Sequence, residues 1–382
     1  MLVDVFAVSL FLIVYTYLLY PALLWLLTFG RPRQTFPDST AEPKVSLILA
    51  AYNEIAVIAE KLENTLSLSY PAEKLEIIAV SDCSDDGTDE VIASYRNRGV
   101  QFKRMEQQSG KTIAQNAGVR LATGDILVFS DANSIFASDA LSELVRPFEE
   151  PAVGSVCGEL RYRNPGAEGA GEGEGLYWRY ERFLKRQESR LSSTLGANGG
   201  IYALRRELFD ELDQAIISDF IMPVRVWRKG FRVVYVPDAV AIETTGATYR
   251  DEFRRRQRII ARSWYGLWRE AGVLNPLKHR FFAWQMFSHK LMRWLVPVFL
   301  FVAFVTNLLL SSEAIFQYLL IAQLAFYALA LVGSLERRIL GRVFLFYVPT
   351  YFCAINLGAL FGFFSFIAGK RVSTWKPVER RQ

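Results

Sequence analysis

The residues best suited to chemistry follow short apolar runs that the sequence predicts as buried strands. The run at 126–129 ends in Ser130, Asp131, Ala132 and Asn133. Carboxylate and amide oxygens at the C-terminal end of a buried strand lie where open α/β sheets bind ligands. Such oxygens suit a hard divalent cation, Mg²⁺ or Mn²⁺, which usually bridges to phosphate. Taken alone, the same residues could equally form a loop that caps a helix.

Two other predicted strands end in similar oxygen-rich turns. The run at 45–50 leads into Tyr-Asn-Glu at 52–54, and the run at 75–80 leads into the polar segment 81–88. Helical patterns follow each turn, and this alternation predicts a parallel, doubly wound sheet. Because parallel strands end at one edge, the three turns converge where a nucleotide is expected. The sequence has neither GxGxxG nor GxxxxGK[ST], so it indicates neither a dinucleotide-binding fold nor a P-loop.

Apolar residues make up 51% of the 382-residue chain and gather in four segments. These are 3–28, 295–310, 314–335 and 343–369, each long enough, or nearly so, to cross a bilayer. The first has no basic n-region and no small-residue cleavage site, so we interpret it as a retained anchor. Basic clusters beside these segments contribute to the net charge of +5. They indicate a cytoplasmic side that faces anionic lipid, rather than nucleic-acid binding.

Cysteine and histidine usage argues against disulfides and zinc. Cys83, Cys157 and Cys353 have neither metal-ligand spacing nor even pairing, which fits a reducing cytoplasmic domain. The two histidines, His279 and His289, both lie in a membrane-proximal stretch, so no zinc site is expected.

The second half of the chain adds further candidates. The glycine turn at 196–200 permits close backbone approach, and Asp219 lies at or near the start of a predicted helix. The helix predicted at 176–190 carries aromatic residues at helical spacing, a pattern of core packing more often than of a ligand platform. Residues 164–175 are predicted to form a flexible loop, and 231–236 and 239–243 two short strands. Residues 250–270 are predicted to form a basic amphipathic helix suited to a membrane surface.

Together these pieces resemble membrane-anchored, inverting, family 2 glycosyltransferases with a GT-A domain, distantly similar to cellulose- and hyaluronan-synthase-type enzymes. The resemblance covers roughly residues 43–270. It rests on an ordered set of motifs rather than on any one of them: 51–54, 81–88, 110–111, 124–125 with 130–133, 196–200, 218–219 and 254–258.

The resemblance implies a role for each matching residue. The residues implied to hold the donor nucleotide are Ala51, Tyr52, Glu54, Asp82, Lys111 and Asp131. Asp131 and Asn133 would hold Mg²⁺ or Mn²⁺. Asp219 would be the general base, and Arg258 would pair with the leaving diphosphate. The acceptor or sugar region would include Asn198, Gly199 and Trp178.

Several positions depart from the family's pattern. Ser81 replaces the first Asp of the second-strand pair, and Asn133 replaces the last Asp of the DxD motif. A neutral oxygen ligand should hold the metal less tightly. Ser218 precedes the base in place of an acidic residue. Of the QxxRW motif only the arginine, Arg258, is present, and Ile259 stands where the tryptophan would be.

The expected architecture is an α/β GT-A domain with a Rossmann-like, mostly parallel sheet, inserted between transmembrane helices. The expected divisions are an anchor at 1–30, a cytoplasmic GT-A domain at 43–247, amphipathic interface helices at 248–292, transmembrane segments at 293–370 and a basic tail at 371–382. The expected reaction transfers a sugar, with inversion, from a nucleotide sugar (a UDP-sugar first) to a lipid-linked or glycan acceptor for cell-surface polysaccharide or glycolipid.

Two alternatives stay open at this point. One is a processive synthase that extrudes its polymer; the other is a catalytically silent scaffold of a polysaccharide complex, which the substituted motif positions allow. The expected location is the inner or plasma membrane, with export or assembly proteins as candidate partners. Three full spans after the domain would place the basic tail outside, unless 343–369 is a hairpin or re-entrant.

Overall fold

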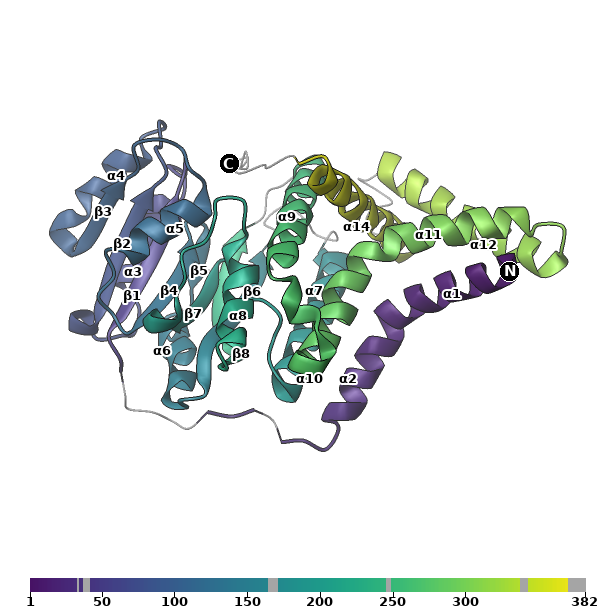
Figure 1. Ribbon diagram of the computed structural model, residues 1–382. Coiled ribbons are helices and arrows are strands. Elements are labelled where there is room, and N and C mark those ends of the chain that lie inside the picture. The colour runs from purple at the N-terminus through teal and green to yellow at the C-terminus, as the bar shows by residue number, and fades with distance from the viewer. Residues whose placement is uncertain (33, 37–41, 164–170, 245–248, 337–342, 370–382) are drawn as a thin grey trace.

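The computed structural model describes the chain except for residues 33, 37–41, 164–170, 245–248, 337–342 and 370–382. It shows an α/β domain joined to a bundle of long apolar helices, which extends to the right in Figure 1. The N-terminus lies at the end of this bundle that is remote from the sheet.

Within the described residues, one eight-stranded sheet has the order β3-β2-β1-β4-β7-β6-β8-β5. Its strands are β1 (Val45–Ala51), β2 (Leu75–Ser81), β3 (Val100–Arg104), β4 (Ile126–Asp131), β5 (Ser134–Phe136), β6 (Val153–Arg163), β7 (Ile201–Arg205) and β8 (Arg232–Thr244). Strands β3, β2, β1 and β4 pair in parallel. Strand β7 runs antiparallel to β4 and β6, and β8 runs parallel to β6. The predicted mostly parallel sheet is confirmed.

The apolar strands are buried on both faces of the sheet. Every residue of β1 is buried, and in β4 only Asp131 is partly exposed. Val45 and Leu47 of β1 share a core with α3 (Ile58–Leu66), α4 (Thr88–Ser94) and α6 (Ala140–Val145). Ile48 and Ala50 share the opposite core with α5 (Lys111–Val119) and α8 (Ser218–Arg228). Two helix layers therefore explain why these strands read as continuous apolar runs.

Four stretches of the described residues are long and apolar enough to cross a membrane: Leu2–Thr28, Pro276–Leu309, Ala314–Leu335 and Phe344–Ile367. The first comprises α1 (Leu2–Val14), a π-helical turn (Tyr15–Leu19) and α2 (Tyr20–Thr28). The second comprises α10 (Pro276–Gln285), a π-helical turn (Met286–Leu291) and α11 (Met292–Leu309). The last two are α12 (Ala314–Leu335) and α14 (Phe344–Ile367).

The segment 343–369, which the sequence left open as a span, hairpin or re-entrant, contains one continuous helix, α14. It packs along α9 (Tyr249–Arg269), whose predicted helical character is confirmed. A Cβ at Gly362 would lie 2.8 Å from the Cβ of Ile260, so only glycine permits this approach of the two helices. Gln257 Nε2 donates a hydrogen bond of 3.0 Å to Ser365 Oγ.

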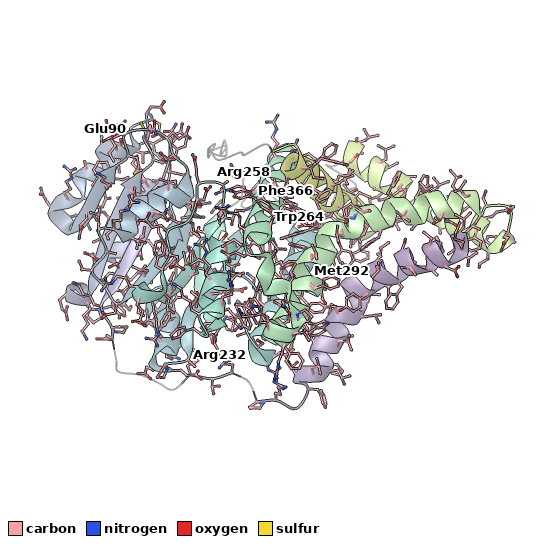
Figure 2. The ribbon with its side chains drawn as sticks, in the orientation of Figure 1. Glu90, Arg232, Arg258, Trp264, Met292 and Phe366 are labelled. Carbon is pink, nitrogen blue, oxygen red and sulfur yellow. The ribbon has the colours of Figure 1, made fainter. Side chains whose placement is uncertain are left out.

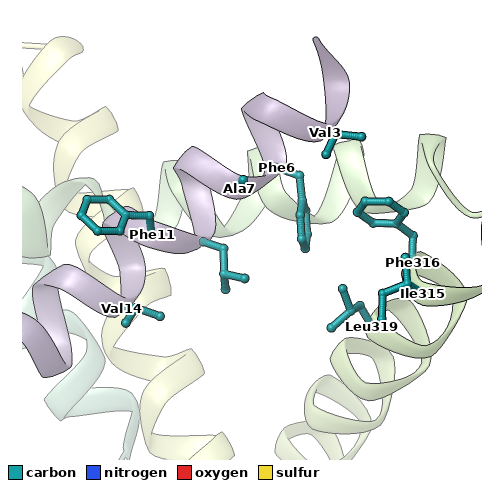
Figure 3. A pocket seen from close by; sticks show the side chains of 9 residues that line it. Val3, Phe6, Ala7, Phe11, Val14, Ile315, Phe316 and Leu319 are labelled. Atoms are coloured by element: carbon teal, nitrogen blue, oxygen red, sulfur yellow. The ribbon is translucent and has the colours of Figure 1, made fainter.

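An apolar groove separates α1 from α12 at the end of the bundle remote from the sheet (Figure 3). Phe6 and Phe316 meet edge to face across it, with ring centroids 5.4 Å apart. The residues that line it are Val3, Phe6, Ala7, Leu10, Phe11, Val14, Ile315, Phe316 and Leu319. An entirely apolar lining fits surroundings of lipid rather than water.

Two local predictions differ from the structure. The loop predicted at 164–175 is wrong for its second part, because α7 (Gly171–Leu191) already begins at Gly171; its first part, 164–170, lies outside the described residues. Two short strands predicted at 231–236 and 239–243 form the single strand β8, whose pairing with β6 shifts register midway. The shift absorbs the polar residues that appeared to separate two strands.

Candidate active site

Strand direction gathers the candidate residues at one edge of the sheet. Strand β7 starts at the edge where β4 ends, because the two are antiparallel and Ser130 pairs with Ile201. The glycine turn 196–200 therefore meets the end of β4. Strand β5 turns back antiparallel to β8, and its Ser134 pairs with Glu243. Residues distant in sequence become neighbours through this register alone.

The turns after β1 and β2 are joined by reciprocal hydrogen bonds. Asn53 Nδ2 donates to Asp85 Oδ1 at 2.7 Å, and the Asp85 backbone N–H donates to Asn53 Oδ1 at 3.0 Å. The backbone N–H of Glu54 donates to Thr88 Oγ1 at 2.9 Å. These contacts fix one wall of the site beside Tyr52, whose side chain is half-buried. Many oxygens of the second turn thus hold the loops together.

Asp82 is fully buried and holds the loop that precedes α5. Its Oδ1 accepts a hydrogen bond from the Ser109 N–H and its Oδ2 one from the Gly110 N–H, both at 2.7 Å. Burial raises the pKa of Asp82, and these two N–H groups oppose that shift. The carboxylate thereby fixes the start of the helix that carries Lys111. Contact of Asp82 with a nucleobase stays a prediction.

The ammonium of Lys111 lies among three carboxylates. It forms an ion pair with Asp131 and donates a 3.4 Å hydrogen bond to the carbonyl oxygen of Gly199. Burial lowers the pKa of Lys111. The charges of Asp131, Asp219 and Glu243 raise this pKa by more than burial lowers it, so the net shift is upward. The site therefore gathers three negative charges around the Lys111 ammonium.

Asp219 lies in the first turn of α8, as predicted, and touches the glycine turn. Its backbone carbonyl accepts a 2.7 Å hydrogen bond from the Ala197 N–H. A Cβ at Gly199 would lie 2.6 Å from Asp219 Oδ2, so this carboxylate occupies space that only glycine leaves free. Burial raises the pKa of Asp219; Lys111 opposes the shift and Asp131 adds to it, and the net direction is upward. Raised basicity suits a proton acceptor.

Arg262 is a residue that the sequence analysis missed. Its guanidinium donates to the Ile216 carbonyl at 2.6 Å and to Thr112 Oγ1 at 3.1 Å. Burial, and then the charge of Arg258, lowers the pKa of Arg262 to about 10. Arg262 thus joins α9 and α5 to the turn that leads into α8, and it positions Asp219.

Arg258 lies one turn earlier on α9 (Figure 2). Among the described residues it has no hydrogen bond or ion pair, and its side chain is partly exposed. Trp264 instead packs its ring against Trp294 and Phe366, with centroids 5.1 and 6.1 Å apart. Trp264 therefore belongs to the contact with the apolar helices, whereas Arg258 is available to an anionic ligand.

Asn198 fixes the glycine turn against the end of β6. Its Nδ2 donates to the Gly158 carbonyl at 2.6 Å, and its Oδ1 accepts from Lys185 on α7. Trp178 lies two turns before Lys185 and packs on Tyr162, with ring centroids 4.6 Å apart. The Trp178 ring is half-buried, and its contact with a sugar stays a prediction.

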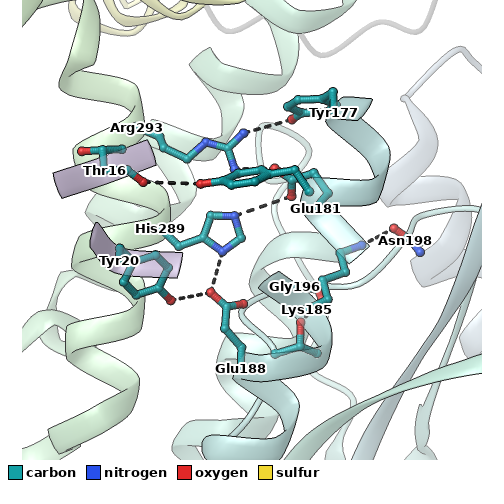
Figure 4. A network of polar contacts seen from close by, with 12 residues as sticks. Thr16, Tyr20, Tyr177, Glu181, Lys185, Glu188, Gly196, Asn198, His289 and Arg293 are labelled. Atoms are coloured by element: carbon teal, nitrogen blue, oxygen red, sulfur yellow. Dashed lines mark hydrogen bonds and ion pairs between the residues drawn. The ribbon is translucent and has the colours of Figure 1, made fainter. Parts of the chain in front are cut away.

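The same helix α7 connects the site with the first two apolar stretches (Figure 4). Glu188 Oε1 accepts a 2.6 Å hydrogen bond from the Tyr20 hydroxyl and lies 2.7 Å from His289 Nδ1. Glu181 forms an ion pair with Arg293. Buried charges are tolerated when they are paired in this way, so these contacts fix α7 against both stretches.

Lys61 and Glu243 were also missed. Lys61 is fully buried; its Nζ donates a 2.5 Å hydrogen bond to the Ser134 carbonyl and lies 4.0 Å from the Phe136 ring centre. Burial lowers the pKa of Lys61 to about 7, against the opposing charges of Asp131 and Glu243. Glu243 ends an apolar run, and the rule that found Asp131 could have found it.

The side chains at the end of β4 fit a divalent cation bound together with a diphosphate. The Asn133 amide has no hydrogen bond to the described residues, and Asp131 is paired with Lys111. In the described part of the chain, no three His, Cys, Asp or Glu side chains are grouped to hold a metal by themselves. One carboxylate and one amide suit Mg²⁺ or Mn²⁺, which takes further ligands from phosphate and water.

Comparison with known proteins relates the chain to glycosyltransferases. Residues 46–213 match the family model described as glycosyl transferase family 2. The chain contains a family 2 glycosyltransferase domain. It is 26% identical over 255 residues to the probable glycosyltransferase YdaM of Bacillus subtilis (strain 168), covering 61% of this chain and 58% of that protein. It is 28% identical over 226 residues to the poly-beta-1,6-N-acetyl-D-glucosamine synthase of Staphylococcus aureus (strain COL), covering 56% of this chain and 54% of that one.

The glycosyltransferase domain has the expected GT-A-like fold. The solved structure of the mannosyltransferase PcManGT from Pyrobaculum calidifontis, in complex with GDP-Man and Mn²⁺, superimposes with a TM-score of 0.74. The similarity covers 96% of this chain and 99% of that one at 20% identity, which shows a shared fold. By contrast, the chain spans a little over half the length of the two curated relatives.

Two glycines of one turn provide a matched test of the site geometry. Gly199→Ala should lower donor-dependent turnover by about 100-fold, because its Cβ would displace Asp219 and Lys111. Gly196→Ala should stay within a few-fold of wild type, because its Cβ would meet its nearest atom at 3.5 Å, an ordinary contact. Steady-state release of nucleoside diphosphate measures both. Equal turnover of the two variants would contradict the placement of Asp219.

Proposed function

We propose that this protein transfers a sugar, with inversion, from a nucleotide sugar to a lipid-linked or glycan acceptor in cell-surface polysaccharide or glycolipid synthesis. One observation carries the proposal. Asp219, a partly buried carboxylate with a raised pKa, contacts the same glycine turn as Lys111, which is paired with Asp131. A proton acceptor thus lies beside the groups suited to a diphosphate.

The roles of the residues follow from their contacts. Asp219 would accept the proton of the attacking hydroxyl, and one such carboxylate suffices for a direct displacement that inverts the anomeric carbon. A divalent cation held by Asp131 and Asn133 would neutralise charge on the diphosphate. Arg258, which has no partner in the described part of the chain, would pair with the departing diphosphate, where fixed positive charge is most effective.

The donor is proposed to be a UDP-sugar. The name of the Staphylococcus aureus relative supports an N-acetylhexosamine donor, whereas the Pyrobaculum calidifontis structure contains GDP-Man and Mn²⁺. Both names support a nucleotide-sugar donor, and the second supports a divalent metal. GDP-sugars therefore belong in the same screen.

The side chain that follows Arg258 on α9 is relevant to the processive alternative. Processive relatives place a tryptophan beside the arginine, and the side chain here is Ile259, with 37% of its surface exposed. Trp264 does not replace it, because its ring packs against Trp294 and Phe366. We therefore propose transfer of one or a few sugars, although the relative named as a polymer synthase favours the alternative.

A donor screen with a matched inactive variant tests the proposal. Purified full-length protein with a glycan or lipid-linked acceptor should release UDP, or else GDP, from one nucleotide sugar. Asp219→Asn should lower this rate by about 10²–10⁴-fold while nucleotide binding is retained, because the amide cannot accept a proton. No release from any donor would support a silent scaffold, and unchanged turnover of Asp219→Asn would remove it as the base. Long polymer formed at low conversion would favour a processive synthase.

The pH profile gives a second readout of Asp219. Its pKa is raised, so kcat/KM should fall as the pH drops through a value above the ordinary 3.8 of aspartate.

We further propose a multi-pass protein of the inner or plasma membrane with its catalytic domain in the cytoplasm. The first stretch, α11 and α12 would cross the membrane. Helix α14 would lie on the cytoplasmic side, because Phe366 near its end packs on Trp264 of α9. This arrangement would place the tail with the catalytic domain, as its basic charge favours.

Cysteine labelling in intact cells tests this topology. Ser312→Cys, between α11 and α12, should react with an impermeant maleimide from outside. Leu277→Cys and Ala368→Cys should react only after permeabilisation; all three positions are exposed on the protein. Wild-type protein controls for the native cysteines. Labelling of Leu277→Cys from outside would overturn the orientation.

A further inference from the structure

We propose that Glu243 is a further residue of the cation site: a second carboxylate that acts with Asp131 and compensates for the neutral Asn133. This inference rests on the proposed function, because it concerns the cation that accompanies the donor. It assigns to Glu243 a direct contribution to cation binding, which no motif of the sequence suggested.

The position of Glu243 follows from strand register. It lies opposite Ser134 in the β5–β8 pair, and its Oε1 contacts the Ser134 hydroxyl. Strand β5 begins directly after Asn133, so this contact brings the end of β8 beside the turn of Asp131. A Cβ at Gly200 would lie 2.7 Å from Glu243 Oε1, which places the carboxylate against the glycine turn as well.

The environment of Glu243 favours a cation. Its side chain is only 7% exposed, and its second carboxylate oxygen, Oε2, has no hydrogen bond or ion pair with the described residues. Burying a charged carboxylate with a half-satisfied set of partners is costly. Lys61 donates to the Ser134 carbonyl and Lys111 is paired with Asp131, and the positive charges of Arg255 and Lys111 act on the Glu243 carboxylate. A divalent cation at the end of β4 would add a direct ligand contact for this second oxygen.

Charge counting gives the same result. The affinity of an oxygen site for a divalent cation rises with the number of charged ligands. With Asp131 and Asn133 alone, the protein offers one negative charge. Glu243 raises the number of negatively charged ligands to two. The neutral amide of Asn133 then no longer implies weak binding of the cation.

Direct titration of Mn²⁺ tests the inference without any sugar donor. The full-length protein in detergent is titrated with Mn²⁺, with and without UDP, and free Mn²⁺ is measured by electron paramagnetic resonance. Glu243→Gln should weaken Mn²⁺ binding by about 10–100-fold, the size of effect that residues around a metal site usually have. Glu207→Gln, an equal loss of charge at an exposed position, should have no effect. Adding Asn133→Asp to Glu243→Gln should restore most of the affinity, because it returns the second charge.

A further variant separates cation binding from support of the fold. Ser134→Ala removes the contact that holds Glu243 but keeps both carboxylates, so Mn²⁺ affinity should stay within a few-fold of wild type. If Ser134→Ala and Glu243→Gln weaken binding equally, or if Asn133→Asp fails to restore it, Glu243 only supports β5. If Glu243→Gln does not fold, Glu243→Asp decides. It keeps the charge but draws the carboxylate back by one methylene, so Mn²⁺ binding should weaken, and unchanged affinity would overturn the inference. Failure of the donor screen with normal Mn²⁺ binding would count against the proposed function alone.

Discussion

The structure of the site depends on the interaction of Lys111 with one buried and two partly exposed carboxylates. Lys111 is paired with Asp131, and the charges of Asp131, Asp219 and Glu243 all act on its ammonium. Removing several like charges from water is costly unless cations and hydrogen-bond donors surround them. The site therefore holds its carboxylates close together because the surrounding elements are fixed, and it is suited to an added cation and a diphosphate.

The surrounding elements supply that fixation from three directions. Asp82 anchors the start of α5, and Arg262 anchors the turn before α8, so Lys111 and Asp219 approach from helices held at their N-terminal ends. The glycine turn leaves the space that Asp219 occupies. Helices α7 and α9 carry these constraints outward, because each packs on apolar helices at its other face. Sugar transfer next to a membrane would depend on this connection.

The sequence predicted the parts that local rules govern. Asp131 and Asp219 could be found because each lies at a strand or helix end, and Lys111 because it opens a helix. Glu243 follows an apolar run in the same way, but its proximity to Asp131, and that of Lys61, could not be predicted, because it arises from the β5–β8 register and from side-chain burial. Nothing in the arginine-rich stretch 254–262 distinguishes Arg258, which has no partner among the described residues, from Arg262, which is bound to carbonyl oxygens. The sequence also could not predict that α14 is one continuous helix. Its glycines allow contact with α9 and do not form a turn.

Nucleotide binding with and without a divalent cation tests the central claim most directly. Wild-type full-length protein in detergent is titrated calorimetrically with UDP, and in parallel with GDP, in Mn²⁺ and in EDTA. Clustered carboxylates should repel a diphosphate unless a cation lies between them, so the preferred nucleotide should bind at least about tenfold tighter in Mn²⁺. Equal affinity in Mn²⁺ and EDTA would show that Lys111 and Arg258 alone receive the diphosphate, and it would contradict the account.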